Sequence, residues 1–171
     1  APGDDYSQFA NDFEYEETFD QRDAIESVID DMTNHKAMDR VICGDVGFGK
    51  TEVAMRASFI AANSYKQVAI LVPTTLLAQQ HFLTFRDRFA NWPFKIESIS
   101  RFQSPIETKE IREKLSQGKI DILIGTHKIL NQEFIFKDLG LLVIDEEHRF
   151  GVRQKEKLKS LKSEVDILTL T

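Results

Sequence analysis

The chain has 171 residues, of which 42% are hydrophobic and 29% are charged, and its net charge is −6. This composition predicts one globular domain with a hydrophobic core and excludes a disordered or fibrous chain. No apolar run approaches the roughly 18 residues that span a bilayer, so we expect no membrane partner. The single cysteine, Cys43, excludes an internal disulfide and suits a reducing, cytoplasmic compartment. We expect it to be a small buried residue at the end of a strand.

The negative charge is concentrated near the amino terminus. Residues 1–23 carry eight acidic residues and one arginine, so the remaining 148 residues have a net charge of +1. We interpret residues 1–20 as a solvated, acidic lead-in and residues 21–171 as the folded domain. Both ends are expected to be cut from a longer protein, because no methionine begins the chain and residues 168–171 lie in an apolar run. The net charge neither supports nor excludes a DNA partner, because binding depends on local charge.

Helical patterns alternate with short apolar runs along the chain. A first helix is predicted at Gln21–Met32, with Asp20 as its N-cap. Runs rich in Val, Ile and Leu predict strands at Arg40–Cys43, Gln67–Val72, Lys95–Ser100, Ile120–Ile124, Leu141–Ile144 and Asp166–Leu170. Further helices are predicted at Thr51–Asn63, Leu76–Ala90, Ile106–Gln117 and Gln154–Leu161. Ser104 as N-cap, Pro105 at the first helical position and Gly118 just past the end bracket the third of these.

This alternation with short connections predicts an α/β fold, in which a mostly parallel central sheet has helices on both faces. Ligands of such folds bind at the carboxyl ends of the strands. Residues that carry chemistry are therefore expected directly after the predicted strands.

One such segment is Gly44–Thr51, which has the pattern G-x-x-x-x-G-K-T between a predicted strand and a predicted helix. Its glycines let backbone N–H groups turn toward phosphate oxygens, and the start of the helix attracts anions. Lys50 would reach the β- and γ-phosphates, and the Thr51 hydroxyl would ligate Mg²⁺. The predicted nucleotide-binding residues of this loop are Gly44, Asp45, Val46, Gly47, Phe48, Gly49, Lys50 and Thr51.

A second segment supplies carboxylates at the same edge of the sheet. The strand Leu141–Ile144 leads directly into Asp145 and Glu146. Asp145 would hold Mg²⁺, and Glu146 would orient and deprotonate the attacking water. With Lys50, these are the predicted catalytic residues of an ATP- and Mg²⁺-dependent site. A transition-metal site at residues 147–148 is the weaker interpretation, because neighbouring residues on a turn seldom converge on one ion.

The segment Asp145–His148, D-E-E-H, resembles the DExH box of superfamily 2 helicases and translocases. The resemblance implies a RecA-like P-loop NTPase lobe. The N-K-x-D sequence of GTPases does not occur in the chain. Pro73–His81 resembles motif Ia, Gly125–His127 resembles motif Ib, and Thr169–Thr171 resembles the opening of motif III. Upstream, Phe13, Thr18 and Gln21 resemble a Q-motif, in which the glutamine amide reads the adenine edge.

Polar residues at the ends of several strands suit a nucleic-acid backbone. Hydroxyls, backbone N–H groups and a cation bind phosphates, and none of them is aimed at bases. Singly, each is more often a capping or turn residue; together they indicate a track for double-stranded DNA. Binding would be independent of sequence and would weaken with salt. The predicted contacts are Thr74, Thr75, Arg101, Gly125, Thr126 and His127.

Longer stretches are similar to bacterial transcription-repair coupling factors, over nearly all of residues 10–171. The stretches are Met38–Ala57, Val72–His81, Phe85–Pro93, Gly118–Lys128 and Asp145–Val152. The resemblance implies the first of two RecA-like lobes of a DNA translocase, which pushes on DNA at a stalled RNA polymerase and recruits excision repair. The second lobe, with its arginines, and the modules for RNA polymerase and excision-repair proteins would lie outside this chain. Phe19 departs from the family pattern, which has proline there.

Two alternatives stay open. A RecG-type fork-remodelling helicase shares the ending His148–Val152, but typically has other residues at Cys43, Phe48 and Glu147. A nucleotide-dependent interaction module without motor activity belongs to a different class, and it does not predict threonines at the strand ends.

Overall fold

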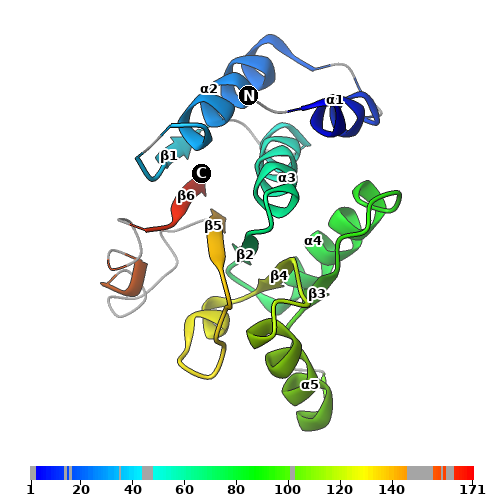
Figure 1. Ribbon diagram of the computed structural model, residues 1–171, viewed down its shortest axis with the longest axis vertical. Coiled ribbons are helices and arrows are strands. Elements are labelled where there is room, and N and C mark those ends of the chain that lie inside the picture. Colours follow the sequence, from blue (N-terminus) through cyan, green and yellow to red (C-terminus); the bar gives the residue numbers. More distant parts are fainter. Residues whose placement is uncertain are drawn as a thin grey trace.

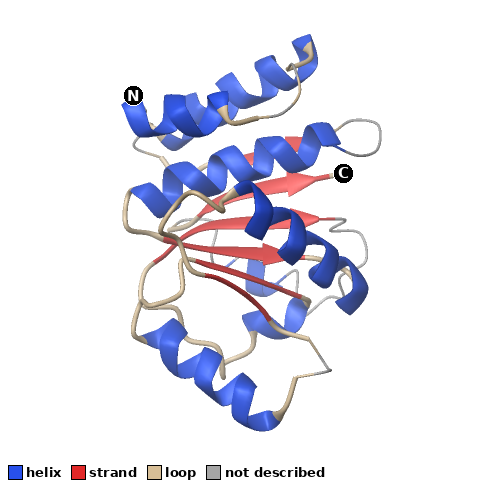
Figure 2. Cartoon of the chain, turned by 90° about the vertical axis from the view of Figure 1, so that its right-hand side faces the viewer, coloured by secondary structure: helices blue, strands red, loops and turns tan. Residues whose placement is uncertain are grey.

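In the described part of the chain, six parallel strands form one sheet with the order β1-β6-β5-β2-β4-β3. The computed structural model describes residues 3–13, 15, 17–34, 36–43, 48–100, 103–145, 156–158, 160 and 164–171. The strands are β1 (Asp39–Ile42), β2 (Gln67–Leu71), β3 (Ile96–Ser98), β4 (Ile122–Gly125), β5 (Leu139–Asp145) and β6 (Asp166–Leu170). Because all of these strands run in the same direction, their carboxyl ends lie together at one end of the sheet (Figure 2).

Helices cover both faces of the sheet (Figure 1, Figure 2). They are α1 (Asp4–Asn11), α2 (Phe19–Met32), α3 (Phe48–Asn63), α4 (Thr75–Arg88), α5 (Pro105–Ser116) and the short 3₁₀ helix η1 (His127–Leu130). α1 to α4 share one hydrophobic core, whereas α5, η1 and Leu158 belong to the other. No described helix combines the length and the apolar character that crossing a membrane requires.

Alternate residues of the same strand point into the two cores. Val68 and Ile70 of β2 belong to the first core, and Ala69 and Leu71 belong to the second. All four side chains are buried, which is the pattern of a strand covered on both faces. The α/β fold predicted from the sequence, with a parallel sheet between two layers of helices, is confirmed.

The predicted ends of α5 are confirmed. The Ser104 hydroxyl accepts a hydrogen bond from the Glu107 N–H at 3.1 Å, and Pro105 occupies the first position of the helix. Gly118 follows the helix with a φ of +76°, a conformation that favours glycine. Of the helix predicted at Gln154–Leu161, residues 156–158 and 160 are helical, and the others lie outside the described residues.

The N-cap predicted for α2 is wrong. Thr18, and not Asp20, caps the helix, which begins at Phe19. The Thr18 hydroxyl accepts a hydrogen bond from the Gln21 N–H at 3.1 Å, and the Gln21 Oε1 accepts one from the Thr18 N–H at 2.8 Å. This reciprocal pair satisfies two backbone donors, whereas Asp20 alone would satisfy one.

Two further expectations need correction. The segment predicted as a solvated lead-in contains α1, and its Phe9 is fully buried against Phe59, with ring centroids 4.4 Å apart. Cys43, predicted to be buried, is exposed. It follows β1, which lies at the edge of the sheet, and Val41 of that strand is also exposed. An edge strand has a neighbour on one side only, so its end is less completely covered.

Candidate nucleotide and nucleic-acid site

Strand β6 separates the strands that lead to the two predicted catalytic segments. β1 precedes the phosphate-loop sequence, and β5 ends at Asp145. In the register of the sheet, Leu170 of β6 is paired with Ile42 on one side and with Asp145 on the other. The end of β1 at Ile42 and Asp145 are therefore level with each other and two strand spacings apart, roughly 10 Å.

Part of the predicted site lies outside the described residues. For Phe48 only the backbone, at the start of α3, is described. The predicted site residues outside the described part are Gly44, Asp45, Val46, Gly47, Arg101 and Glu146, and so are Glu147 and His148.

The first turn of α3 carries Gly49, Lys50 and Thr51. The Lys50 ammonium donates a hydrogen bond to the carbonyl oxygen of Thr171 at 2.8 Å. The Thr171 N–H in turn donates to the carbonyl oxygen of Ile42, and this bond extends the pairing of β1 and β6. Lys50 therefore lies at the carboxyl ends of the strands, where its ammonium group has further donors available.

Gln21 lies against the beginning of α3. A Cβ built on Gly49 would come within 3.3 Å of the Gln21 Nε2, so glycine allows the close approach of the two segments. The Gln21 Oε1 is engaged in the cap of α2, which orients the amide. The structure thus brings the predicted adenine-reading residue next to the predicted phosphate-binding helix.

A hollow of about 400 Å³ adjoins this helix. Phe13, Tyr15, Thr51 and Arg88 contribute to its lining. The rings of Phe13 and Tyr15 meet edge to face, with centroids 5.8 Å apart. The Q-motif pattern predicted a role for Phe13 but not for Tyr15. The signal for Tyr15 is a second aromatic residue two positions after Phe13.

Buried charged side chains form a network next to this hollow. The Glu52 carboxylate accepts hydrogen bonds from Arg56 at 2.7 Å and from Arg88 at 2.8 and 2.9 Å. Arg56 also pairs with Glu17, and Arg88 lies 3.9 Å from the centroid of the Phe9 ring. The network links α1, α3 and α4, and its side chains are almost completely buried at Glu52 and Arg56.

Asp145 makes a long-range contact that was not predicted from the sequence. Its Oδ2 lies 3.2 Å from the Nε2 of His81 on α4, and both side chains are mostly buried. Its Oδ1 has no hydrogen-bond partner among the described residues. Carboxylate and hydroxyl oxygens are the ligands that Mg²⁺ prefers, so Asp145 and Thr51 are chemically suited to this ion. His81 lies in the stretch that resembles motif Ia, but its residue type alone indicated no role.

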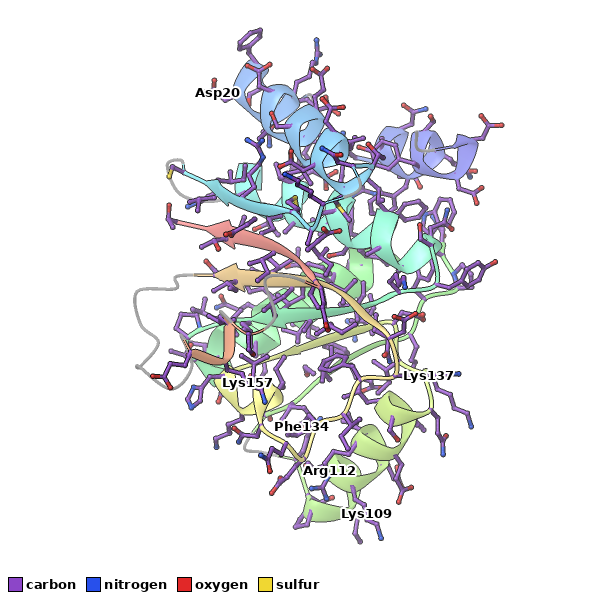
Figure 3. The ribbon with its side chains drawn as sticks, turned by 60° about the vertical axis from the view of Figure 1, so that its left-hand side comes forward. Asp20, Lys109, Arg112, Phe134, Lys137 and Lys157 are labelled. Carbon is purple, nitrogen blue, oxygen red and sulfur yellow. The ribbon has the colours of Figure 1, made fainter. Side chains whose placement is uncertain are left out.

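A second hollow, of about 370 Å³, lies at the same edge of the sheet and contains Thr75 and Thr126. Its polar lining is Thr75, Ser100, Gln103, Thr108, Arg112, Thr126, Lys128, Asn131 and Glu133. Arg112 of α5 and Phe134 of the loop after η1 lie at the same end of the molecule (Figure 3). The cations Arg112 and Lys128 were not among the predicted contacts, although Lys128 directly follows His127.

The other predicted DNA contacts have identifiable structural roles. The Thr74 hydroxyl caps α4 by accepting a hydrogen bond from the Leu77 N–H at 3.2 Å. Gly125 is buried, and a Cβ there would lie 2.6 Å from the Cγ2 of Ile129. His127 is exposed at the start of η1. Thus Thr75, Thr126 and His127 present polar groups at this edge, while Gly125 permits close packing.

Comparison with known sequences identifies relatives over nearly the whole chain. The sequence profile of the DEAD/DEAH box helicase family matches residues 18–171. The transcription-repair-coupling factor of Escherichia coli (strain K12) is 63% identical over 166 residues, and that of Haemophilus influenzae is 62% identical over 167 residues. These matches cover 97% and 98% of this chain but only 14% and 15% of the relatives' own lengths.

Solved structures show the same fold. RecG bound to a three-way DNA junction has a TM-score of 0.86 and 33% identity, covering 99% of this chain and 22% of that chain. The UvsW helicase from bacteriophage T4 has a TM-score of 0.69 at 18% identity, covering 97% of this chain and 58% of that chain. The RecA-like helicase fold is therefore confirmed. The chain belongs to the DEAD/DEAH box helicase family and is similar, over nearly its whole length, to one segment of transcription-repair-coupling factors.

Proposed function

We propose that this chain is the first RecA-like lobe of an ATP-dependent translocase on double-stranded DNA, of the transcription-repair-coupling type. The observation that carries the proposal is the 62–63% identity to coupling factors over nearly the whole chain. The RecG structure is similar in fold at 33% identity. That likeness makes a RecG-type fork helicase the second candidate.

ATP would bind at the start of α3. The loop 44–49 would cradle its phosphates, and Lys50 would contact the β- and γ-phosphates. The position of Gln21 against Gly49 supports this end of the site as the place where the adenine would bind. A hollow lined by Phe13, Tyr15 and Thr51 adjoins the same helix.

Hydrolysis would involve the carboxylates that follow β5. Thr51 and Asp145 would hold Mg²⁺, which neutralises charge on the phosphate oxygens when it is bound. Glu146 would orient the attacking water and accept its proton. The register that aligns Ile42, Leu170 and Asp145 supports this assignment, because it brings the two segments to the same edge.

The second hollow would grip the DNA backbone. Thr75 and Thr126 offer hydroxyls there, Lys128 adds a cation, and Arg101 and His127 would extend the track. Contacts of this kind recognise phosphates rather than bases. Binding should therefore be independent of sequence and should weaken steeply with salt.

The remaining partners would be contacted by other parts of the full-length protein. A second RecA-like lobe would close over the ATP and supply arginines to the transition state. RNA polymerase and excision-repair proteins would bind to modules outside residues 1–171. This chain would then contribute one half of the ATP-binding site and one part of the DNA-binding surface.

The test uses the full-length protein that contains this chain. We expect ATP-dependent displacement of a stalled RNA polymerase from DNA, and we expect Lys50→Ala and Asp145→Asn to reduce it to background. Lys109→Ala, at an exposed position of α5, is the control and should retain the activity. Regression of a model fork without displacement of the polymerase would instead favour the RecG-type function. Displacement that survives Lys50→Ala would contradict the assigned ATP site.

A further inference from the structure

Helix α4 connects the two candidate sites of the molecule. Its first residue, Thr75, lines the hollow that contains Thr126. His81 lies six residues further along the helix, about 9 Å by the helical rise. Its imidazole reaches Asp145 at the end of β5. One rigid element therefore contacts both the proposed DNA track and the proposed metal-binding carboxylate.

The contact between His81 and Asp145 is specific in its geometry. The Nε2 lies 3.2 Å from Oδ2, and the two side chains are 17% and 23% exposed. Because a carboxylate only accepts hydrogen bonds, the proton of this bond lies on the Nε2 of His81. The Phe85 ring packs edge to face on the imidazole, with centroids 6.4 Å apart, and limits its rotation. The bond uses Oδ2 and leaves Oδ1 without a partner among the described residues.

We propose that His81 is a positioning residue for Asp145, and that it transmits the engagement of DNA at Thr75 to the metal-binding carboxylate through α4. The inference rests on the proposed function. A hydrogen bond to a metal-binding carboxylate fixes the direction of its free oxygen, and the loss of such a partner typically lowers metal affinity or activity about 10–100-fold. A shift of α4 on binding DNA would therefore move Oδ1 relative to the nucleotide.

The first measurement is the Mg²⁺ dependence of nucleotide binding by the full-length protein, monitored with a fluorescent ATP analogue. His81→Leu removes the donor, and we expect it to raise the Mg²⁺ concentration for half-maximal binding by about 10-fold or more. His81→Gln keeps a hydrogen-bond donor on a side chain of similar reach. Its Mg²⁺ concentration for half-maximal binding should therefore lie close to that of the unsubstituted protein. Lys109→Leu, on the exposed surface of α5, is the control for introducing a leucine.

The second measurement separates coupling from simple anchoring of α4. We expect His81→Leu to reduce the stimulation of ATP hydrolysis by double-stranded DNA while the Kd for DNA stays unchanged. Thr75→Val should show the opposite pattern: a weaker affinity for DNA and an unchanged Mg²⁺ dependence without DNA. If leucine disturbs the packing on Phe85, His81→Met removes the same donor with a more adaptable side chain.

A normal Mg²⁺ dependence together with normal DNA stimulation in folded His81→Leu and His81→Met would overturn the inference. Lower thermal stability as the sole effect would overturn it too, because a purely structural bond predicts that result. Failure of the proposed function gives a different result. In that case the unsubstituted protein would not bind the ATP analogue, or Lys50→Ala would bind it as well as the unsubstituted protein does.

Discussion

At the scale of single residues, the chain buries a network of charged side chains that depend on one another. Glu52 is 1% exposed and is the shared partner of Arg56 and Arg88. Burial makes each of these charges dependent on its partners, because water no longer solvates them. The network therefore behaves as a unit that ties α3 to α4.

Glu52→Ala should strongly destabilise the chain. The substitution leaves two buried guanidinium groups without their shared carboxylate, and breaking a buried pair in this way costs about 3–5 kcal/mol. Urea unfolding monitored by circular dichroism measures the change. Glu110→Ala, at an exposed position of α5, is the matched control, and its free energy of unfolding should be close to that of the unsubstituted chain. Equal stability of the two variants would show that the network contributes little.

Gly125 tests a packing constraint at the edge of the proposed DNA track. A Cβ at this position would lie 2.6 Å from the Cγ2 of Ile129, so Gly125→Ala should destabilise the chain by about 1–3 kcal/mol. Removing the clashing side chain should relieve part of that cost, so Gly125→Ala and Ile129→Ala should be less than additive in unfolding experiments. Gly3→Ala is the control, because no atom lies within 4 Å of its added Cβ. Strict additivity would contradict the proposed clash.

At the scale of secondary structure, an aspartate secures each edge strand. The Asp166 carboxylate, at the start of β6, accepts the N–H of Met38 just before β1 at 2.6 Å. The Asp121 carboxylate, just before β4, accepts the N–H of Lys95 just before β3 at 2.8 Å. β1 and β3 are the two edges of the described sheet, and each has one neighbour. These side chains thus mark where each edge strand begins to pair.

Asp166 also predicts a pH dependence. Burial raises its pKa above the ordinary value of 3.8, with a smaller opposing effect from the Met38 bond. The folded chain therefore holds this proton more tightly than the unfolded chain does. Consequently, the contribution of Asp166 to the free energy of unfolding should fall as the pH rises from about 3.8 through the raised pKa.

Asp166→Asn should make that slope less negative, because the amide keeps an acceptor oxygen for Met38 but carries no ionisable proton. The measurement is a series of urea titrations at closely spaced pH values above pH 4. Asp23→Asn, at an exposed position of α2, serves as the control. An unchanged slope in Asp166→Asn would show that other groups cause the pH dependence.

At the scale of the whole molecule, the proposed function places an ATP-binding site and part of a DNA-binding surface at the carboxyl ends of the strands of a single sheet. It spans about 15% of the length of the relatives that it matches. In the proposed function, the arginines that stabilise the transferring phosphoryl group come from a second lobe. Such an arginine contributes about 10³–10⁵ in rate.

The isolated chain should therefore hydrolyse ATP very slowly, and double-stranded DNA should not stimulate it. Phosphate release measured with and without DNA at low salt tests this expectation. The full-length protein under the same conditions is the reference and should be strongly stimulated. Substantial DNA-stimulated turnover by the isolated chain would contradict the requirement for a second lobe.

Local patterns in the sequence were sufficient to predict the fold class, the six strands and the caps of α5. The continuous apolar strands and the run Ser104-Pro105 reflect interactions among near neighbours, which are readable along the chain. The pattern G-x-x-x-x-G-K-T and the D-E-E-H segment likewise identified the phosphate and carboxylate residues. Their assigned roles remain predictions, since several of these residues lie outside the described part of the chain.

Only the tertiary structure decided which distant residues meet. The strand order inserts β6 between β1 and β5. This order brings Lys50 to Thr171 at the end of β6 and sets Asp145 two strands from the end of β1. Packing of α4 on the sheet brings His81 to Asp145 across 64 positions of sequence. Strand order and helix packing depend on the burial of two whole cores, and no local periodicity encodes them. The sequence by itself therefore determined the kinds of residue available at the candidate sites, and the tertiary structure decided their partners.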